Sequence, residues 1–100
     1  MKRERDHKKY FRVSDIVEVC DVSVEFIRAL EEENLVKSVR RRRVKFYPVE
    51  QVDRIRVAQI LVHEMGVNLA GVEVALNMRE QLIGMRQELA VILRQLGRTP

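Results

Sequence analysis

The last quarter of the chain carries a regular apolar repeat that a single helix cannot bury on itself. Apolar side chains recur at alternating intervals of three and four residues, in the order Ala75, Met78, Leu82, Met85, Leu89, Ile92, Leu96. This is the a/d register of a coiled coil over three heptads. We therefore expect a helix in region 77–100 that pairs with a second copy of the chain through Met78, Leu82, Met85, Leu89, Ile92 and Leu96. A helix folded back on its own domain is the alternative.

Two short helices separated by a tight turn are predicted near the start of a domain that spans residues 10–76. Ser14 can cap the first helix, and Asp21 tolerates the left-handed backbone of a turn. Ser23 can cap a second helix that ends near Asn34. The inner face of this second helix is expected to carry Val24, Ile27 and Leu30. Together the two helices form a helix-turn-helix unit.

A strongly basic segment follows the second helix. Between Lys37 and Lys45 the chain holds six positive charges and no acid, and strand-forming residues flank the arginines. A small hairpin with a basic tip fits this pattern. Four consecutive arginines repel one another, and their planar guanidinium groups are suited to bind phosphate. Beside a helix-turn-helix unit, the hairpin is therefore predicted to be a phosphate-binding wing; a solvated charge run is the alternative.

Two more helices are predicted before the repeat. Pro48 is suited to the first turn of one helix, and Gly66 is expected to end it. The inner stripe of that helix is expected to contain Val52, Ile55, Ala58, Leu61 or Val62, and Met65. Asn68 can then cap a helix carrying Leu69, Val72, Ala75 and Leu76. Residues 1–9 are expected to form a basic, flexible tail, with a phosphate-seeking arm as the alternative.

Composition and motifs argue against several classes of protein. The net charge of +4 suits a polyanionic partner, and no stretch resembles a secretion signal or a membrane span. The lone Cys20 cannot complete a disulfide or a cysteine metal site. His63-Glu64 lacks the second histidine of a zinc protease, and Gly66–Gly71 lacks the lysine of a phosphate-binding loop. We expect no catalysis, metal, cofactor or membrane partner, and a cytoplasmic, nucleoid-associated protein.

The order of these elements resembles the MerR superfamily of winged helix-turn-helix regulators, a mainly α-helical fold. The likeness lies in Phe11–Ile16, Val22–Glu31, Lys45–Tyr47 and Val49–Met65, followed by a Gly-Val-Asn-Leu-Ala-Gly-Val run at 66–72. That run looks most like the HspR branch of heat-shock repressors.

The resemblance implies a homodimeric transcription regulator that binds double-stranded DNA. In that family the second helix enters the major groove, the wing contacts phosphates, and the C-terminal helices form an antiparallel dimer. Carried onto this sequence, the expected DNA-binding residues are Glu25, Phe26, Arg28, Ala29, Arg40, Arg41, Arg42, Arg43, Lys45 and Tyr47.

The sequence also departs from the family pattern in its second helix. Ala29 and Leu30 stand where the family usually has aromatic residues, and Glu31, Glu32 and Glu33 add negative charge. The related CbpM group has an acidic second helix, and its members bind a J-domain co-chaperone. A CbpM-like chaperone modulator, with Phe26 and the acids as its contact surface, is therefore the alternative function. A non-specific nucleoid-associated DNA binder is a third possibility.

Overall fold

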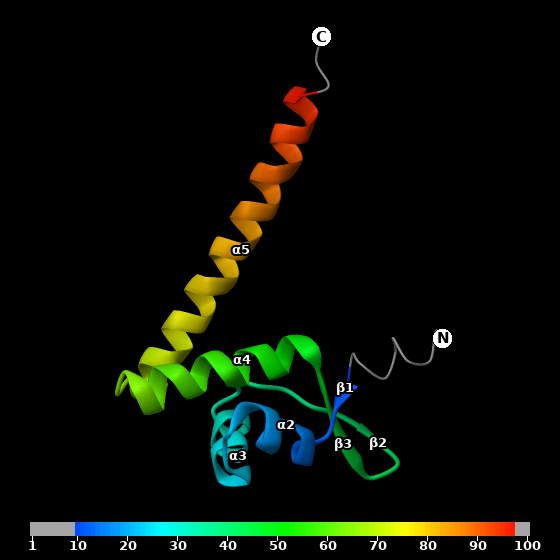
Figure 1. Cartoon of the computed structure of the whole chain (residues 1–100), viewed down its shortest axis with the longest axis vertical. Helices are drawn as coiled ribbons and strands as arrows, with labels where there is room; N and C mark the ends of the chain where they lie inside the picture. The colour runs from blue at the N-terminus through cyan, green and yellow to red at the C-terminus, as the bar shows by residue number, and fades with distance from the viewer. Residues whose placement is uncertain (1–9, 98–100) are drawn as a thin grey trace.

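The computed structural model describes residues 10–97, so the predicted tail at 1–9 lies outside the described residues. A small three-stranded sheet and two short helices underlie a third helix, and a long C-terminal helix projects away from them (Figure 1). The prediction of a mainly helical fold is confirmed. In chain order the elements are β1 (Tyr10–Phe11), α2 (Val13–Cys20), α3 (Val24–Glu32), β2 (Val39–Arg41), β3 (Val44–Pro48), α4 (Val49–Gln59), the π-helical segment η1 (Ile60–Glu64) and α5 (Leu69–Gly97).

The helix-turn-helix unit is confirmed, with one change at its start. Helix α2 begins before Ser14, and the Arg12 N–H donates to Asp15 Oδ2 at 3.1 Å. The predicted Ser14 cap is therefore wrong, because Ser14 already lies in the first helical turn. Asp21 adopts a left-handed backbone with φ of 56°, as the turn requires. The predicted cap of α3 is confirmed, since Ser23 Oγ accepts from the Phe26 N–H at 3.0 Å.

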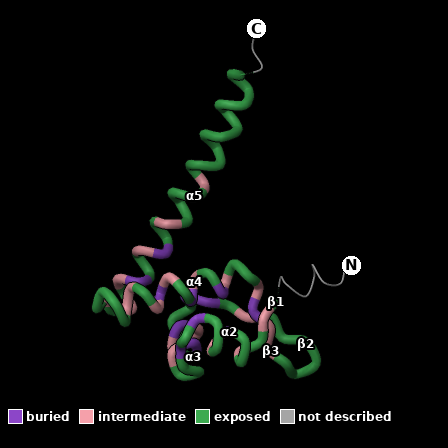
Figure 2. The backbone as a smooth tube through the Cα atoms, in the orientation of Figure 1, coloured by how far each residue is buried: buried purple, intermediate pink, exposed green. Residues whose placement is uncertain are grey.

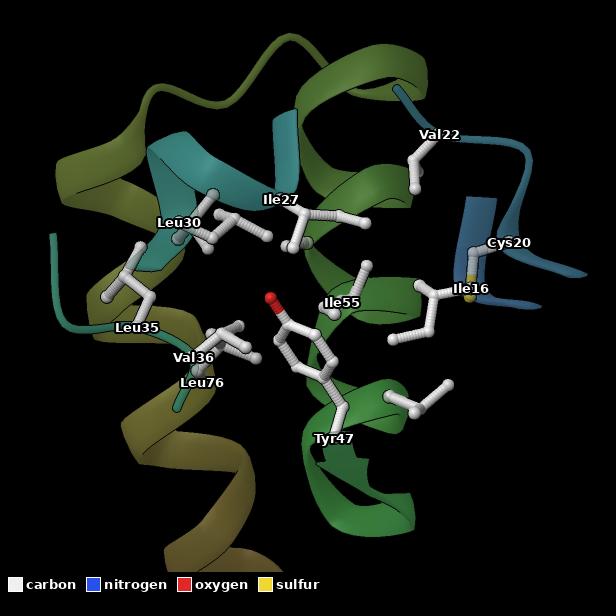
Figure 3. Packing of buried hydrophobic residues seen from close by; sticks show 13 residues of the cluster. Ile16, Cys20, Val22, Ile27, Leu30, Leu35, Val36, Tyr47, Ile55 and Leu76 are labelled. Carbon is white, nitrogen blue, oxygen red and sulfur yellow. The ribbon is translucent and has the colours of Figure 1, made fainter. Parts of the chain in front are cut away.

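The hydrophobic core lies where α2, α3 and α4 meet the first turns of α5. Ile16, Leu30 and Ile55, one from each of the first three helices, have no exposed surface (Figure 3). Burying each such side chain contributes about 1.5–3 kcal/mol. Val24 was predicted to face this core but is 41% exposed, so that prediction is wrong. The core also contains Cys20, Val22, Ile27, Leu35, Val36, Tyr47, Val52, Ala58, Val72 and Leu76.

The predicted hairpin is present and belongs to a three-stranded antiparallel sheet with the strand order β1-β3-β2. Arg41 pairs with Val44, so only Arg42 and Arg43 form the turn between β2 and β3. Both turn residues have positive φ, at 50° and 68°. This is the backbone of a tight hairpin turn whose twist matches that of the flanking strands.

A π-helical turn follows α4 and changes the predicted inner stripe. The Met65 N–H donates to the Ile60 carbonyl, five residues back, at 3.1 Å. The wider turn shifts the register after it, so Met65 is 66% exposed rather than buried as predicted. Gly66 then ends the segment with φ of 70°, as expected. Asn68 caps α5, because its Oδ1 accepts from the Gly71 N–H at 2.8 Å.

Helix α5 is continuous over Leu69–Gly97, so the boundary predicted between residues 76 and 77 falls within one helix. Leu76 is its last buried residue, and Figure 2 shows the helix exposed over most of its remaining length. The alternative in which this helix folds back on its own domain is therefore wrong for the single chain. We term residues 10–76 the head and residues 77–97 the arm.

Candidate nucleic-acid interface

The register of the hairpin divides its cations between two faces. Arg40 lies directly opposite Lys45, so these two side chains share a face of the sheet. Arg41 lies opposite Val44 and therefore belongs to the other face. That other face also carries Phe46, whose ring lies 5.8 Å from the guanidinium carbon of Arg12. The predicted wing cations do not form one uniform surface.

The face with Arg40 and Lys45 is the one next to α3. Lys45 and Arg28 line the same shallow hollow between the hairpin and α3. The hollow is completed by Val13, Val24, Ile27, Glu31 and Tyr47. The structure thus brings together a cation from α3 and cations from the hairpin, on one side of the head.

Glu31 joins α3 to the hairpin through a single carboxylate. Its Oε1 accepts from the Tyr47 hydroxyl at 2.6 Å and from Lys45 Nζ at 3.3 Å. Its Oε2 accepts from the Ser38 hydroxyl at 3.0 Å. The side chain of Glu31 is only 19% exposed, which strengthens these interactions relative to a surface pair. Three residues of the wing are therefore fixed to the last turn of α3.

The electrostatics of this cluster follow from its contacts. Burial alone would raise the pKa of Glu31, but the hydrogen bonds from Tyr47, Ser38 and Lys45 together hold that pKa below its ordinary value. Burial and the adjacent carboxylate both raise the pKa of Tyr47. Glu31 is therefore ionised and Tyr47 neutral at physiological pH, which is the state in which the hydroxyl donates to the carboxylate.

Tyr47 was predicted at the DNA interface, and the structure places it elsewhere. It is 1% exposed, and its ring lies among Ile27, Val36 and Ile55, with its hydroxyl oxygen directed towards α3 (Figure 3). A side chain enclosed in this way cannot contact a macromolecule on the surface. The expected DNA contact of Tyr47 is therefore withdrawn, and its function is to anchor β3 in the core.

The four positions expected to read bases on α3 are not equally accessible. Glu25 and Arg28 are exposed, whereas Phe26 and Ala29 are half-buried. The Phe26 ring stacks at a tilt on His63 of η1, with a centroid separation of 4.8 Å. Phe26 is therefore not the freely exposed side chain that the sequence suggested. The exposed surface of α3 is left with one acid and one base in its first two turns.

The tip of the hairpin is strained and unpaired. An L-residue in the left-handed region costs about 1–2 kcal/mol, and glycine or asparagine usually occupies such positions. Here two arginines, Arg42 and Arg43, occupy them instead. Within residues 10–97, neither of these arginines has an acidic partner, and the same holds for Arg40 and Arg41. Their charge is available to a partner from outside the chain.

The sequence did not indicate two contributors to this site. One is Ser38, and the other is Glu31 in its role as the hydrogen-bond acceptor that holds the wing. The signal for Glu31 was present, because it lies four residues after the inward-facing Ile27 and next to Leu30. Helical geometry places such a position at the edge of the buried face. No comparable signal marks Ser38, whose partner is seven residues away in a different element.

The described residues also bear on metal binding and on membrane insertion. Among residues 10–97, no three side chains of the histidine, cysteine, aspartate or glutamate types gather closely enough to hold a metal ion. No described helix combines the length and apolarity needed to cross a membrane.

Comparison with known proteins identifies the family. No curated protein matches the chain at a significant level. The family model for MerR HTH family regulatory proteins, by contrast, matches residues 11–95, which include the helix-turn-helix unit, the hairpin, α4 and nearly all of α5. The chain therefore belongs to the MerR family of helix-turn-helix regulatory proteins.

Proposed function

We propose that the chain is a homodimeric transcription regulator that grips promoter DNA with α3 in the major groove and the hairpin on adjacent phosphates. One observation carries the proposal. Arg28 of α3 and Lys45 of the hairpin line a common hollow, and Arg40 shares the face of Lys45. A helix and a hairpin that present cations on the same side match the shape of a groove bordered by phosphates.

The second copy of the chain is proposed from the arm. Met78, Leu82 and Met85 are each about 60% exposed, at 58%, 60% and 64%, and the repeat continues through Leu89, Ile92 and Leu96. An apolar stripe of this length is unfavourable in water and is suited to pair with an identical stripe. Two heads held at a fixed separation would bind two half-sites on one face of the DNA. Such a protein acts where the chromosome lies, in the cytoplasm.

The HspR-like run at 66–72 adds a narrower proposal, that the chain belongs to the heat-shock repressor branch. In this chain the run begins two residues after the end of η1 and continues into the first turn of α5. Asn68 caps α5, and a Cβ at Gly71 would lie 2.7 Å from Val67. The run therefore forms the connection between η1 and α5. Its likeness to the HspR branch concerns this structural connection and not a contact with DNA.

The proposal predicts a strong dependence of DNA affinity on salt. If each head neutralises about three phosphates, a dimer releases about six counterions, and affinity falls roughly a thousandfold between 50 and 200 mM salt. Titration of a labelled fragment of the promoter upstream of its own reading frame measures this slope. An affinity that does not change with salt would exclude phosphate binding.

The sharpest test uses the strained tip, because stability and DNA binding should change in opposite directions there. In R42N/R43G, each new residue suits a left-handed backbone, so we expect a gain of about 1–2 kcal/mol in the free energy of unfolding. The same change removes four charges from a dimer. DNA affinity should fall roughly tenfold or more, and the salt slope should become shallower by up to about 3.6.

The opposite signs exclude misfolding as the cause of weak binding. A matched control is R56Q, which removes an exposed arginine from α4 rather than from the hairpin. This variant should leave the salt slope nearly unchanged. Full DNA affinity in R42N/R43G would contradict a phosphate-binding wing.

The alternative, a modulator of a J-domain co-chaperone, keeps one supporting observation. Glu32 and Glu33 are exposed, and their carboxylates have no partner among residues 10–97. Glu31 and Phe26 do not support it, because the first is bound to the wing and the second to His63. E32Q/E33Q separates the two functions, since it should abolish binding to a basic protein partner and should not weaken binding to DNA.

A further inference from the structure

Arg54 connects three parts of the molecule at the point where the arm leaves the head. It lies on α4, and its side chain is only 15% exposed. Its Nε donates to the Leu35 carbonyl at 2.7 Å, and its Nη1 forms an ion pair with Glu80 of α5. Leu35 in turn is tied to α3, because its N–H donates to the Leu30 carbonyl at 2.9 Å. One guanidinium group thus links the end of α3 to the arm through α4.

A second ion pair lies beside the first. Asp53 Oδ2 is 2.7 Å from Arg79 Nη2, so two consecutive residues of α4 bind two consecutive residues of α5 with the signs exchanged. We term these four residues the clasp: Asp53, Arg54, Arg79 and Glu80. The clasp lies within about one turn of Leu76, the last buried residue of α5. The clasp therefore binds α5 within the first turn that follows its buried residues.

Apolar packing and the clasp constrain α5 in different ways. Val72 and Leu76 hold the base of α5 against the head, but apolar contact is non-directional and permits rocking of the helix about its base. Guanidinium–carboxylate pairs have a defined geometry, because planar donors meet paired acceptor oxygens. The clasp joins α5 to α4 by two ion pairs beyond Leu76, and such directional contacts can fix the direction of the arm in a way that apolar packing does not.

We propose that Arg54 is a positioning residue that fixes the direction of the arm relative to α3, and with it the separation of the two α3 helices in a dimer. The second half of this statement rests on the proposed function. The arm is a lever about 30 Å long, and a tilt of about 10° at its base moves its far end by roughly 5 Å. On DNA that displacement corresponds to between one and two base pairs.

The direction of the arm can be measured without DNA and without reference to the dimer. Spin labels at E18C in α2 and Q87C in the arm, in a C20A background, report one head-to-arm distance. Dilution of labelled protein into a large excess of unlabelled chain isolates the distance within a protomer. We expect R54M to broaden the distance distribution at least about twofold relative to the reference. E80Q, which keeps the Leu35 contact, should broaden it less.

Two controls separate positioning from loss of fold. E73Q changes an exposed glutamate of α5 that has no partner within residues 10–97, and it should leave the distribution unchanged. E80Q alters a side chain that is 55% exposed, so its head should melt as the reference does. Distributions in R54M and E80Q that match the E73Q distribution would overturn the proposal.

The consequence for DNA is tested with a set of half-site separations. The reference chain should prefer one separation by about tenfold over separations one or two base pairs away, and R54M should reduce this preference below about threefold. A broadened distance with an unaltered preference would overturn the step from arm direction to half-site separation. A reference chain that binds none of the DNA fragments would instead refute the proposed function, while the distance measurement still decides how the arm is held.

Discussion

The head and the arm share one helix but treat its apolar side chains in opposite ways. In the head, Val72 and Leu76 of α5 are 0% and 1% exposed. Six residues after Leu76, Leu82 is 60% exposed, and Leu89 is 54% exposed. The change occurs within one continuous helix, and the buried Val72 and Leu76 lie outside the a/d register of the exposed repeat. A single chain therefore buries the apolar residues of its head and leaves those of its arm exposed to solvent.

This difference indicates where stability comes from in each region. Every described buried side-chain nitrogen or oxygen has a hydrogen-bond partner, so the head is satisfied by its own contacts. The arm is joined to α4 by the ion pairs of Arg79 and Glu80, but no described residue of the arm is buried. In proteins most helical stability comes from packing of an apolar face. We term the a/d residues of the arm the seam: Met78, Leu82, Met85, Leu89, Ile92 and Leu96. Burial under a partner helix would stabilise each of its leucines by about 1.5–3 kcal/mol. The head should therefore be stable alone, whereas the arm should be ordered fully only when paired.

The largest expected effect comes from placing charge in the seam of the arm. In L82E/L89E we expect a monomer, because four carboxylates per dimer would have to be buried between the helices. DNA affinity should fall about a hundredfold or more, since two heads would no longer bind as one unit. Sedimentation equilibrium measures the oligomeric state, and titration of the promoter fragment measures the affinity.

The matched control for this variant is V91E, on the same helix. Val91 is 43% exposed but lies outside the a/d register. It should leave both the oligomeric state and the DNA affinity nearly unchanged. A monomeric V91E together with a dimeric L82E/L89E would place the pairing surface on another face of α5, and the exposed a/d residues would then not form the core of a dimer.

The next largest effect is expected in the head, at the carboxylate that holds the wing. We expect E31Q to lower the free energy of unfolding by about 1–2 kcal/mol at pH 7, because it removes a charged acceptor of three hydrogen bonds. The neighbouring E32Q, at an exposed site, should change it by less than about 0.5 kcal/mol. Chemical denaturation of both variants measures these differences.

The same variant should alter the dependence of stability on pH. The folded pKa of Glu31 lies below its ordinary value of 4.5, so the stabilisation is fully present above that value. It should be lost as the pH falls below 4.5 and through the lower, folded pKa. E31Q has no such group, and its stability should decline less steeply in that range. Parallel declines for E31Q and the unaltered chain would show that Glu31 does not carry the stabilisation.

Features of the head that depend on neighbours in the sequence were predictable. Ser23 caps α3, Asp21 takes a left-handed turn, and the arginine run forms a hairpin, because each depends on residues within a few positions. The helix of the arm was also predictable, since its apolar periodicity is a local pattern. Pairing through the a/d residues stays a prediction. The predicted Ser14 cap was wrong although it also depends on nearby residues. Helix α2 begins at Val13, one residue before Ser14, and the Asp15 carboxylate accepts the Arg12 N–H.

Features that depend on distant residues were not predictable from the sequence. Tyr47 has strand neighbours typical of an exposed wing. Its ring is nevertheless buried in the core, and its hydroxyl donates to Glu31, 16 residues away. Arg54 and Glu80 are 26 residues apart, and nothing in either segment indicates that they meet. Met65 was misplaced because a π-helical turn shifted its register, and the cost of such a turn is offset only by tertiary packing.

The smallest expected effects come from two glycines of α5, one on each side of the boundary between head and arm. A Cβ at Gly84, in the arm, would meet no atom within 4 Å, so G84A should gain about 1 kcal/mol from better helix propensity. A Cβ at Gly71, in the head, would lie 2.7 Å from Val67 Cγ1 and 3.3 Å from Asn68 Oδ1. G71A should therefore lose stability, because the Val67 side chain has to move and the capping side chain of Asn68 is crowded.

Calorimetry measures the melting temperatures of the two variants. The dependence of the melting temperature on protein concentration shows whether each variant is a dimer. In G84A the melting temperature should rise and the dimer should persist, since Gly84 lies outside the a/d register. A G84A chain that is less stable at high concentration than the unaltered chain would mean that a partner helix approaches closely at Gly84. The arm would then pair through the face that carries Gly84, and something other than the partner helix would have to cover the exposed leucines.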